Sequence, residues 1–412
     1  QNVIKCGSYV GNGSTDGPEI NLGFEPQWLM IKCTSATGSW GIIDCMRGIV
    51  TGGNDAFSIA NGNNVDYDFD IMELTPTGFK ITASGSILNT NNETFVYTAI
   101  RRSDGYVGKP PELGTDVFAM NTGTSNSDVP TFVSGFPVDF AFNRAFASSE
   151  NWWTQSRLTG TKYLIANSTS AEATSSPNEW DFNNGWYSST SDHSAQQSWM
   201  WKRHAGFDVV TYKGNGTFPR AMPHSLNAVP EMIWVKSRTN TYNWEVYHKG
   251  LNGGTNPEDY HIKLNQTNAA SQTVDMWSST APNATHYFMG DHAVNANNQS
   301  FIAMLFASVN GISKVGSYSG SDSTKNITDV GFTPRFIIIK NITTGGEGYN
   351  WYVFDTVRGW GSGNDKALML DDDAAQLTST DYGAPTSTGF DLVGNKGGTN
   401  DAGQTYIYYC HA

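Results

Sequence analysis

The sequence is poor in charged residues and has no long apolar run. Only 15% of its 412 residues are charged, and they leave a formal net charge of −13 at pH 7. A negatively charged chain repels phosphate backbones and anionic lipids, which excludes binding to nucleic acid or to an anionic membrane as the main function. No apolar segment approaches the roughly 18 residues that a membrane span needs. We therefore expect no nucleic-acid partner and no insertion into a membrane.

Cysteine is scarce as well. Four cysteines are too few for a disulfide framework in a chain of this size. We interpret them as small packing residues with free thiols. A bridge between Cys33 and Cys45 is the alternative, and it would indicate an oxidising compartment. The other two cysteines are Cys6 and Cys410.

Long amphipathic helices are also missing, because no stretch of more than about two turns has helical periodicity. The sequence contains instead 43 glycines and 13% aromatic residues. Together with abundant Ser, Thr and Asn, this composition favours turn-rich β structure with aromatic cross-strand pairs. It predicts an all-β protein.

One pattern occurs four times along the chain. Its clearest copy, residues 315–359, has a Gly-Ser-Tyr start, a Gly-Phe-x-Pro turn, an apolar strand at 336–340 and a tryptophan-led strand at 351–355. The same order opens the chain, and each copy ends in an alternating β pattern. The period of about a hundred residues exceeds that of a solenoid unit, so each copy should be a domain with its own core.

We therefore predict four tandem antiparallel β-sandwich domains of the jelly-roll or concanavalin A-like lectin type. An immunoglobulin-like sandwich is the alternative, although its Cys-Trp-Cys spacing is missing. The first copy opens with the same motif as the fourth copy, and the fourth copy follows directly on a completed repeat. We therefore expect a further domain before Gln1 in the parent protein. The predicted domains are residues 1–103, 104–206 (the divergent copy), 207–314 and 315–412.

One polar position recurs in all four copies, after the strand that follows the tryptophan-containing strand. It predicts an Asx turn that caps a strand, and the alternative is a ligand for a sugar hydroxyl or Ca²⁺ at the rim of the sandwich. The run Asp371, Asp372 and Asp373 is the alternative metal site, but it lacks the spacing of an EF-hand, so we predict no required cofactor. The recurring residues are Asn61, Asn167, Asn265 and Asp371.

Aromatic residues crowd the second copy beyond what one core requires. Most should pack in cores or between domains, and a minority on loops would stack on sugar rings. Our candidate ligand-binding residues of this kind are Trp152, Trp186 and Tyr187.

An acidic pattern in the first copy is the candidate for catalysis. Asp68, Asp70 and Glu73 are predicted to alternate along one strand, with a bulge before the last. They resemble the catalytic strand of laminarinase-type glycoside hydrolases, where nucleophile and acid lie about 5–5.5 Å apart. Here Asp68 replaces the first glutamate, and the fourth copy keeps only Asp381 of the three acids. We therefore predict that the protein is not an enzyme.

Three longer blocks carry a family resemblance: RRSDGYVGKP at 101–110, SWMWKRHAGFDVVTY at 198–212 and VYHKGLNGGTNP at 246–257. They resemble an uncharacterised family of repeat-built virion proteins from tailed phages of marine bacteria, cyanophages especially, which are labelled tail fibre or virion structural protein. The resemblance implies a location in the phage particle and brings no catalytic residues with it.

The residues and the resemblance together predict a tail-fibre or appendage segment of a virion that contacts polysaccharide on the host surface. Its partners would be other virion proteins, the host glycan and, by analogy with fibres, two further copies of itself in a trimer. A purely architectural capsid decoration or adaptor is the first alternative. A laminarinase-like glycan depolymerase is the second.

Overall fold

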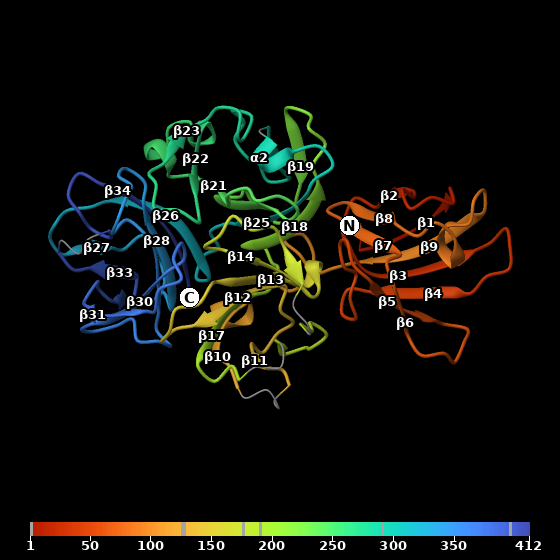
Figure 1. Cartoon of the computed structure of the whole chain (residues 1–412), viewed down its shortest axis with the longest axis horizontal. Helices are drawn as coiled ribbons and strands as arrows, with labels where there is room; N and C mark the ends of the chain where they lie inside the picture. Colours follow the sequence, from red (N-terminus) through yellow and green to blue (C-terminus); the bar gives the residue numbers. More distant parts are fainter. Residues whose placement is uncertain (1–2, 125–128, 175–177, 189–191, 291, 395–397) are drawn as a thin grey trace.

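The computed structural model describes residues 3–124, 129–174, 178–188, 192–290, 292–394 and 398–412. Nearly all of its regular structure is β strand in antiparallel sheets, which confirms the all-β prediction (Figure 1). Within these residues no helix is long and apolar enough to cross a membrane.

The strands fall into four successive sets, which we call units 1 to 4. Unit 1 contains β1 (Ile4–Val10), β2 (Glu19–Asn21), β3 (Pro26–Cys33), β4 (Trp40–Asp44), β5 (Asp55–Ile59), β6 (Tyr67–Phe69), β7 (Met72–Thr75), β8 (Gly78–Ile81), α1 (Ser86–Asn89) and β9 (Thr94–Arg101). Unit 2 contains η1 (Gly114–Asp116), β10 (Phe118–Thr122), β11 (Phe132–Val133), β12 (Phe140–Ala145), β13 (Trp153–Ser156), η2 (Arg157–Thr159), β14 (Lys162–Ile165), β15 (Ala173–Thr174), β16 (Gly185–Trp186) and β17 (Gln196–Trp201).

The second half of the chain repeats this arrangement. Unit 3 contains β18 (Phe207–Lys213), β19 (Arg220–Pro223), β20 (Met232–Ser237), β21 (Glu245–His248), η3 (Leu251–Gly254), η4 (Pro257–Asp259), β22 (Tyr260–Lys263), β23 (Ser271–Gln272), β24 (His286–Met289), α2 (His292–Asn295) and β25 (Ser300–Phe306). Unit 4 contains β26 (Ser313–Ser319), β27 (Lys325–Ile327), β28 (Phe336–Asn341), β29 (Trp351–Asp355), β30 (Asp365–Met369), β31 (Leu377–Thr380), β32 (Pro385–Thr386), β33 (Gly389–Leu392) and β34 (Thr405–His411).

Each unit is a sandwich of a large sheet and a small sheet. The large sheet has six strands, and the last strand of the unit lies between the first and the third, as in β1-β9-β3-β4-β5-β6. The small sheet is built on the second strand of the unit, as in β2-β8-β7. Because the first and last strands pair, each unit closes on itself. The start predicted for the fourth domain, residue 315, falls inside β26, which begins at Ser313.

The two faces of each large sheet have different neighbours. In unit 4, Ile337 and Ile339 of β28 pack inside the sandwich with Phe390 of the small sheet. Their neighbours Phe336 and Ile338 point the other way, as alternation along a strand requires, and belong to a core shared with units 2 and 3. This explains why the predicted strand 336–340 is apolar at every position except its last.

Units 2, 3 and 4 bring the outer faces of their large sheets together in a ring, visible at the centre and left of Figure 1. Aromatic contacts join each pair of units across this ring. The ring centroids are 5.1 Å apart for Phe118 and Phe336, 5.7 Å for Phe140 and Phe207, and 4.8 Å for Phe306 and Tyr409.

A buried tryptophan closes each contact of the ring. The indole Nε1 at the matching position of each unit donates a hydrogen bond to the carbonyl that ends the fifth strand of the next unit. Unit 2 contacts unit 4, unit 4 contacts unit 3, and unit 3 contacts unit 2, so the ring closes after three units. The pairs are Trp152 with Met369 at 2.7 Å, Trp351 with Lys263 at 2.9 Å and Trp244 with Ile165 at 3.0 Å.

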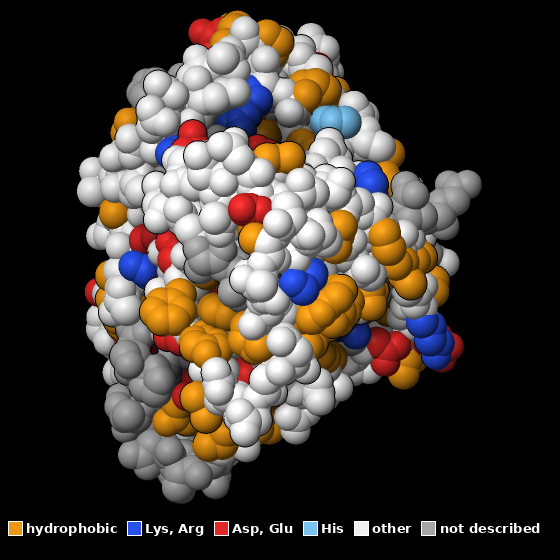
Figure 2. All heavy atoms as spheres, turned by 90° about the vertical axis from the view of Figure 1, so that its right-hand side faces the viewer, with side chains coloured by type: hydrophobic (Ala, Val, Ile, Leu, Met, Phe, Trp, Pro, Cys, Tyr) orange, Lys and Arg blue, Asp and Glu red, His pale blue; other side chains and the backbone are white. Residues whose placement is uncertain are grey.

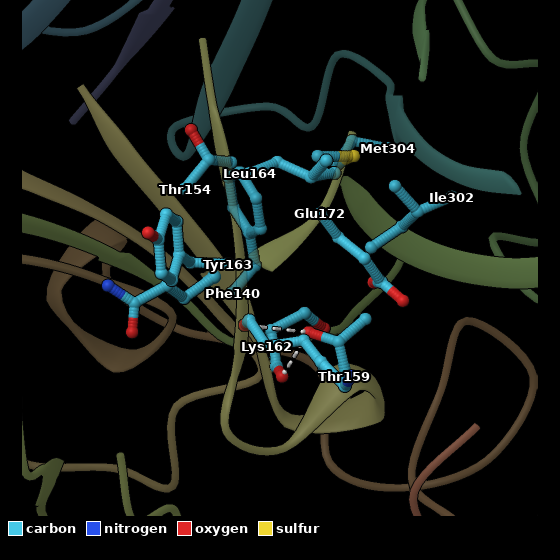
Figure 3. A pocket seen from close by; sticks show the side chains of 11 residues that line it. Phe140, Thr154, Thr159, Lys162, Tyr163, Leu164, Glu172, Ile302 and Met304 are labelled. Carbon is cyan, nitrogen blue, oxygen red and sulfur yellow. Dashed lines mark hydrogen bonds between the residues drawn. The ribbon is translucent and has the colours of Figure 1, made fainter. Parts of the chain in front are cut away.

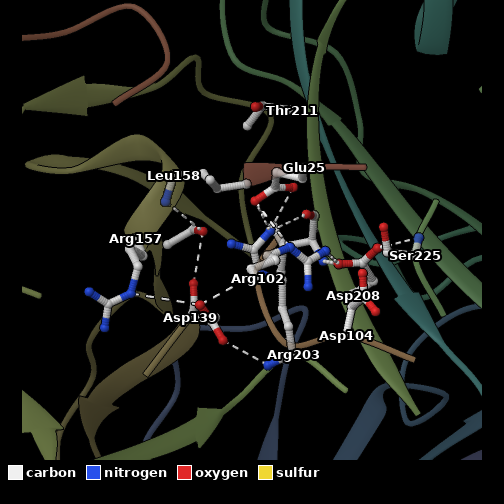
Figure 4. Close-up of polar contacts among 12 residues, drawn as sticks. Glu25, Arg102, Asp104, Asp139, Arg157, Leu158, Arg203, Asp208, Thr211 and Ser225 are labelled. Atoms are coloured by element: carbon white, nitrogen blue, oxygen red, sulfur yellow. Dashed lines mark hydrogen bonds and ion pairs between the residues drawn. The ribbon is translucent and has the colours of Figure 1, made fainter. Parts of the chain in front are cut away.

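Unit 1 lies outside this ring and is joined to it by buried charges (Figures 1 and 4). Glu25 of unit 1 accepts hydrogen bonds from Arg203 at 2.8 Å and pairs with Arg102 at 3.1 Å. Arg102 also contacts Asp208 of unit 3 at 2.7 Å, and Asp139 of unit 2 pairs with Arg203 at 3.5 Å. Buried charges are tolerated only when they are paired, so this network fixes unit 1 in one orientation.

Candidate functional site

A groove of about 780 Å³ opens in unit 1 beside β5 and β6. Three aromatic side chains form one wall. Phe57 and Tyr67 are cross-strand partners with ring centroids 5.1 Å apart, and Tyr67 and Phe69 are 6.4 Å apart. Tyr67 and Phe69 share a face because alternate residues of a strand point the same way. Phe69 is 58% exposed, so the outermost ring is open to solvent.

Polar side chains border these rings. Asn64 Nδ2 donates to the hydroxyl of Tyr67 at 2.6 Å, and Thr82 Oγ1 donates to Asp70 Oδ1 at 2.5 Å. Asn61 also lines the groove, and its Oδ1 accepts the backbone N–H of Trp40 at 2.9 Å. The second carboxylate oxygen of Asp70 accepts no hydrogen bond from the described residues. The groove therefore combines aromatic faces with hydroxyl, amide and carboxylate groups.

A buried carboxylate holds the floor of this groove. Asp55 accepts the backbone N–H groups of Val50 at 2.8 Å and of Ile71 and Met72 at 2.9 Å each. Burial raises the pKa of Asp55 to about 7. These bonds draw the chain out of the large sheet after Phe69 and into the small sheet, and so leave the edge beside β6 open.

The three acids proposed for catalysis do not share a strand, contrary to the prediction. Asp68 lies on β6, Glu73 lies on β7 of the small sheet, and Asp70 lies in the crossing between them. The cause is the capture of the next two amides by Asp55, which sends the chain from one sheet to the other. Asp70 lines the aromatic groove, whereas Asp68 lines a separate depression on the side of unit 2. Burial, and to a lesser extent Asp70, raises the pKa of Glu73.

Two of the candidate sugar-stacking residues are fully buried, so that prediction is wrong for them. Trp152 and Trp186 are both 0% exposed. Trp152 lies in the ring of units 2–4, and Trp186 stacks on Trp180 at 5.1 Å while its indole donates to Ser198 at 3.2 Å. Tyr187 is half-buried, and its backbone forms a β bridge with Glu179. The crowding of aromatic residues in the second copy reflects packing.

The recurring polar position makes the same contact in every unit. Its side-chain oxygen accepts the backbone N–H of a tryptophan that lies 15 to 21 positions earlier in the chain. An Asx turn accepts an N–H two residues further on, so the predicted Asx turn is wrong, and the residue instead ties the end of the fifth strand to the start of the fourth. In unit 1 the same residue, Asn61, also borders the groove. The pairs are Asn61 with Trp40 at 2.9 Å, Asn167 with Trp152 at 2.9 Å, Asn265 with Trp244 at 3.0 Å and Asp371 with Trp351 at 2.8 Å.

The run Asp371 to Asp373 is part of the contact between units 4 and 2. The carbonyls of Asp372 and Asp373 accept hydrogen bonds from the guanidinium of Arg144 at 3.1 and 2.9 Å. Burial raises the pKa of Asp371. Among the described residues no group of three or more His, Cys, Asp or Glu side chains could hold a metal ion. The four cysteines are free thiols, so Cys33 and Cys45 are not bridged.

A second cavity lies between units 2 and 3 (Figure 3). Phe140, Leu164 and Glu172 of unit 2 face Ile302 and Met304 of unit 3 across it. Its volume of about 10 Å³ is no more than one water molecule requires, so it is not a ligand site.

The groove aromatics were not identified from the sequence. The local sequence nevertheless contained a signal for them. Tyr67 and Phe69 alternate with the charged Asp68, and this alternation is typical of a strand that is exposed on one face. Thr380 of unit 4 occupies the position of Phe69, because Thr380 pairs with Asp365 as Phe69 pairs with Asp55. The aromatic wall is therefore a property of unit 1 and not of the repeat.

The chain matches a family model over most of its length. The model of a family described as a domain of unknown function, DUF7483, matches residues 3–103 and 188–412, and the chain belongs to this family. The part between these ranges covers most of unit 2, the divergent copy. No curated protein and no solved structure matches the chain.

Proposed function

We propose that this member of the DUF7483 family is a carbohydrate-binding segment of a phage virion appendage, such as a tail fibre, that attaches to polysaccharide on the host surface. The observation that carries the binding is the exposed aromatic wall of the unit 1 groove. The location in a virion rests on the resemblance of the blocks at 101–110, 198–212 and 246–257 to virion proteins.

The groove has the chemistry that sugar recognition needs. The C–H face of a pyranose stacks on an aromatic ring, which Phe69 and Tyr67 offer at the surface. Hydroxyl groups at the edge of the sugar pair with amide and carboxylate oxygens, which Asn61 and Asp70 provide beside the rings. The volume of about 780 Å³ lies within the range of roughly 300–1,000 Å³ typical of ligand sites.

Charge narrows the class of ligand. With a net charge of −13, the chain repels polyanionic glycans at long range. Among the three proposed catalytic acids, only Asp70 lines the groove. We therefore assign a neutral polysaccharide as ligand.

Binding without cleavage is the form of the proposal that the geometry supports. A retaining glycosidase needs two carboxylates about 5–5.5 Å apart that flank one bond, and an inverting enzyme needs them about 6.5–9.5 Å apart. Asp68 and Asp70 line two different depressions, and Glu73 lies on the small sheet. An architectural protein, the other alternative, has no use for an exposed aromatic groove.

The test is adsorption of the fluorescently labelled chain to a panel of marine bacteria and to their isolated neutral polysaccharides, with reducing ends assayed in the same wells. We expect saturable binding to some strains without sugar release. Phe69→Ala should weaken binding roughly ten-fold, because it removes the outer stacking surface. Phe218→Ala is the matched control, since Phe218 is 57% exposed and lies in unit 3 outside the groove.

Three results would reject the proposal. Equal binding by the Phe69→Ala variant and the wild type would exclude the groove, and a lack of binding to every strain would favour the architectural role. Sugar release that Glu73→Gln abolishes would establish the depolymerase instead.

A further inference from the structure

The three contacts between units 2, 3 and 4 use the same hydrogen bonds at equivalent positions of each unit. Beside the tryptophan bond described above, a cation on the third strand of each unit donates to a carbonyl two residues past the recurring Asx position of the next unit. The pairs are Arg144 with Asp373 at 2.9 Å, Lys236 with Thr169 at 3.0 Å and Lys340 with Thr267 at 3.1 Å.

A third bond is made by the backbone alone. The N–H group five residues past the Asx position donates to the carbonyl that follows the third strand of the contacting unit. The pairs are Glu172 with Arg238 at 2.8 Å, Gln376 with Phe146 at 2.9 Å and Ala270 with Ile342 at 3.0 Å. Each contact thus uses two donors and a carbonyl from one unit, and two carbonyls and an amide from the other.

Unit 1 carries both halves of this contact. Lys32 and Trp40 occupy the donor positions, since they pair with each other across β3 and β4 as Lys340 pairs with Trp351 in unit 4. Ile59, which ends β5, and Asn63, two residues past Asn61, provide the matching carbonyls. The third bond has its counterparts in the carbonyl of Thr34 and the N–H of Asp66.

None of these groups is used between units in the described part of the chain. Lys32 Nζ donates to the carbonyl of Cys33 in its own unit at 2.6 Å, and no hydrogen bond joins the indole of Trp40 to another described residue. Trp40 is 38% exposed, whereas Trp152 and Trp244 are 0% exposed.

The sheet face around Trp40 is also uncovered and partly apolar. Ile4 is 62% exposed, and Trp28, Met30 and Ile100 of the same outer face are half-buried. In the ring, the matching position of Trp28 is the buried Phe336. Figure 2 views the molecule from the side of unit 1 and shows hydrophobic side chains gathered at this end of the surface.

We propose that three copies of this chain associate through the outer faces of their unit 1 sheets, in a ring that repeats the arrangement of units 2, 3 and 4. A contact whose two halves differ but lie on one unit is heterologous, and it forms either a closed ring or a filament. The rotation set by this contact closes after three units within the chain. In the trimer, Trp40 of one copy donates to Ile59 of the next, and Lys32 donates to Asn63.

The trimer contact is weaker than the contacts within the chain. At the position of Thr98, the ring units have Trp199, Met304 and Tyr409. At the position of Ser58, unit 4 has the buried Leu368. Fewer apolar contacts lower the affinity and keep the face soluble when it is free, so the trimer should dissociate on dilution.

The test is the mass of the purified full chain, measured by sedimentation velocity and by native mass spectrometry from nanomolar concentration to about 100 µM. We expect a species of three times the 44.9 kDa chain that dissociates on dilution. Trp40→Arg should lower the trimer affinity at least a hundred-fold without changing the melting temperature of the dilute chain. Leu113→Arg, at a residue that is 63% exposed and lies outside this face, is the matched control and should still form trimers.

A single-chain mass at every concentration, or a dimer, would overturn the proposal and leave the face to another partner. If the Trp40→Arg variant formed trimers with the same affinity as the wild type, the contact between copies would lie outside the face around Trp40. The outcome is independent of glycan binding, because Phe69→Ala removes a groove residue and leaves Trp40 and Lys32 in place.

Discussion

Unit 1 and units 2 to 4 share one strand order but differ in what covers the outer face of the large sheet. In the ring the tryptophan at the start of the fourth strand, Trp152, Trp244 or Trp351, is buried against the next unit, and in unit 1 its counterpart Trp40 is 38% exposed. Both kinds of unit form the same sandwich. The comparison teaches that the tryptophan position serves the contact between units, whereas the core inside the sandwich suffices for the fold of each unit.

The two regions are also joined by different forces. The ring is held by apolar contact between aromatic side chains together with hydrogen bonds from tryptophan, cationic and backbone donors. Unit 1 is held by Glu25, Arg102 and Arg203, whose paired charges tolerate little displacement once they are buried. The ionic joint sets where the unit 1 groove points.

The largest expected effect comes from breaking the ring at a tryptophan. Trp244→Ala should lower the free energy of unfolding by about 3–5 kcal/mol, because it leaves a cavity between units 3 and 2 and removes the indole hydrogen bond to the carbonyl of Ile165. Trp40→Ala, its counterpart in unit 1, should cost less than about 1 kcal/mol in the dilute chain. Guanidinium unfolding of the two variants, followed by tryptophan fluorescence, makes the comparison. Equal losses would show that the position serves the fold of each unit.

A second effect should follow from breaking the ionic joint. Glu25→Gln should cost about 3 kcal/mol, because the buried Arg203 loses its closest carboxylate while the amide replaces only part of the hydrogen bonding. Glu112→Gln is the control, since its pair with Lys109 lies at the surface and should contribute less than about 1 kcal/mol. Limited proteolysis between units 1 and 2 should accelerate in Glu25→Gln alone. A cleavage rate equal to that of the control would mean that other contacts hold unit 1.

The smallest expected effect is a change in pH dependence. Burial lowers the pKa of Lys340 in the ring to about 8 from its ordinary value of 10.5. Between these values the unfolded chain binds more protons, so Lys340 makes the folded state more stable as pH rises from 8 to 10.5. Lys340→Met should therefore remove roughly 2 kcal/mol of this gain between pH 8 and 10.

The measurement is the midpoint of urea unfolding at several pH values for the wild type, Lys340→Met and Lys32→Met. The last variant alters the matching position on the exposed face of unit 1. If the urea midpoint changes with pH in the same way for the wild type and for Lys340→Met, Lys340 does not titrate in this range.

Parts of the candidate site were accessible from the sequence and parts were not. The recurrence of Asn61 indicated a structural role, but the predicted Asx turn was wrong, because the partner of Asn61 is Trp40, 21 positions earlier in the chain. The placement of Asp68, Asp70 and Glu73 on one strand was wrong, because the buried Asp55, 16 positions before Ile71, captures the chain at the crossing. The exposure of Trp152 and Trp186 was also predicted wrongly, since burial depends on neighbours that are far away in sequence.

The sequence by itself determined the all-β class, the fourfold repeat and the strands at 336–340 and 351–355, since alternation, turn residues and period are local signals. Only the tertiary structure decided that the outer face of the large sheet is covered in units 2 to 4 and open in unit 1. Nearly identical patterns carry Trp40 and Trp351, yet a ring of three has no place for a fourth unit. The exposed face and the aromatic groove of unit 1 are the consequence, and they are where the function of the chain should be sought.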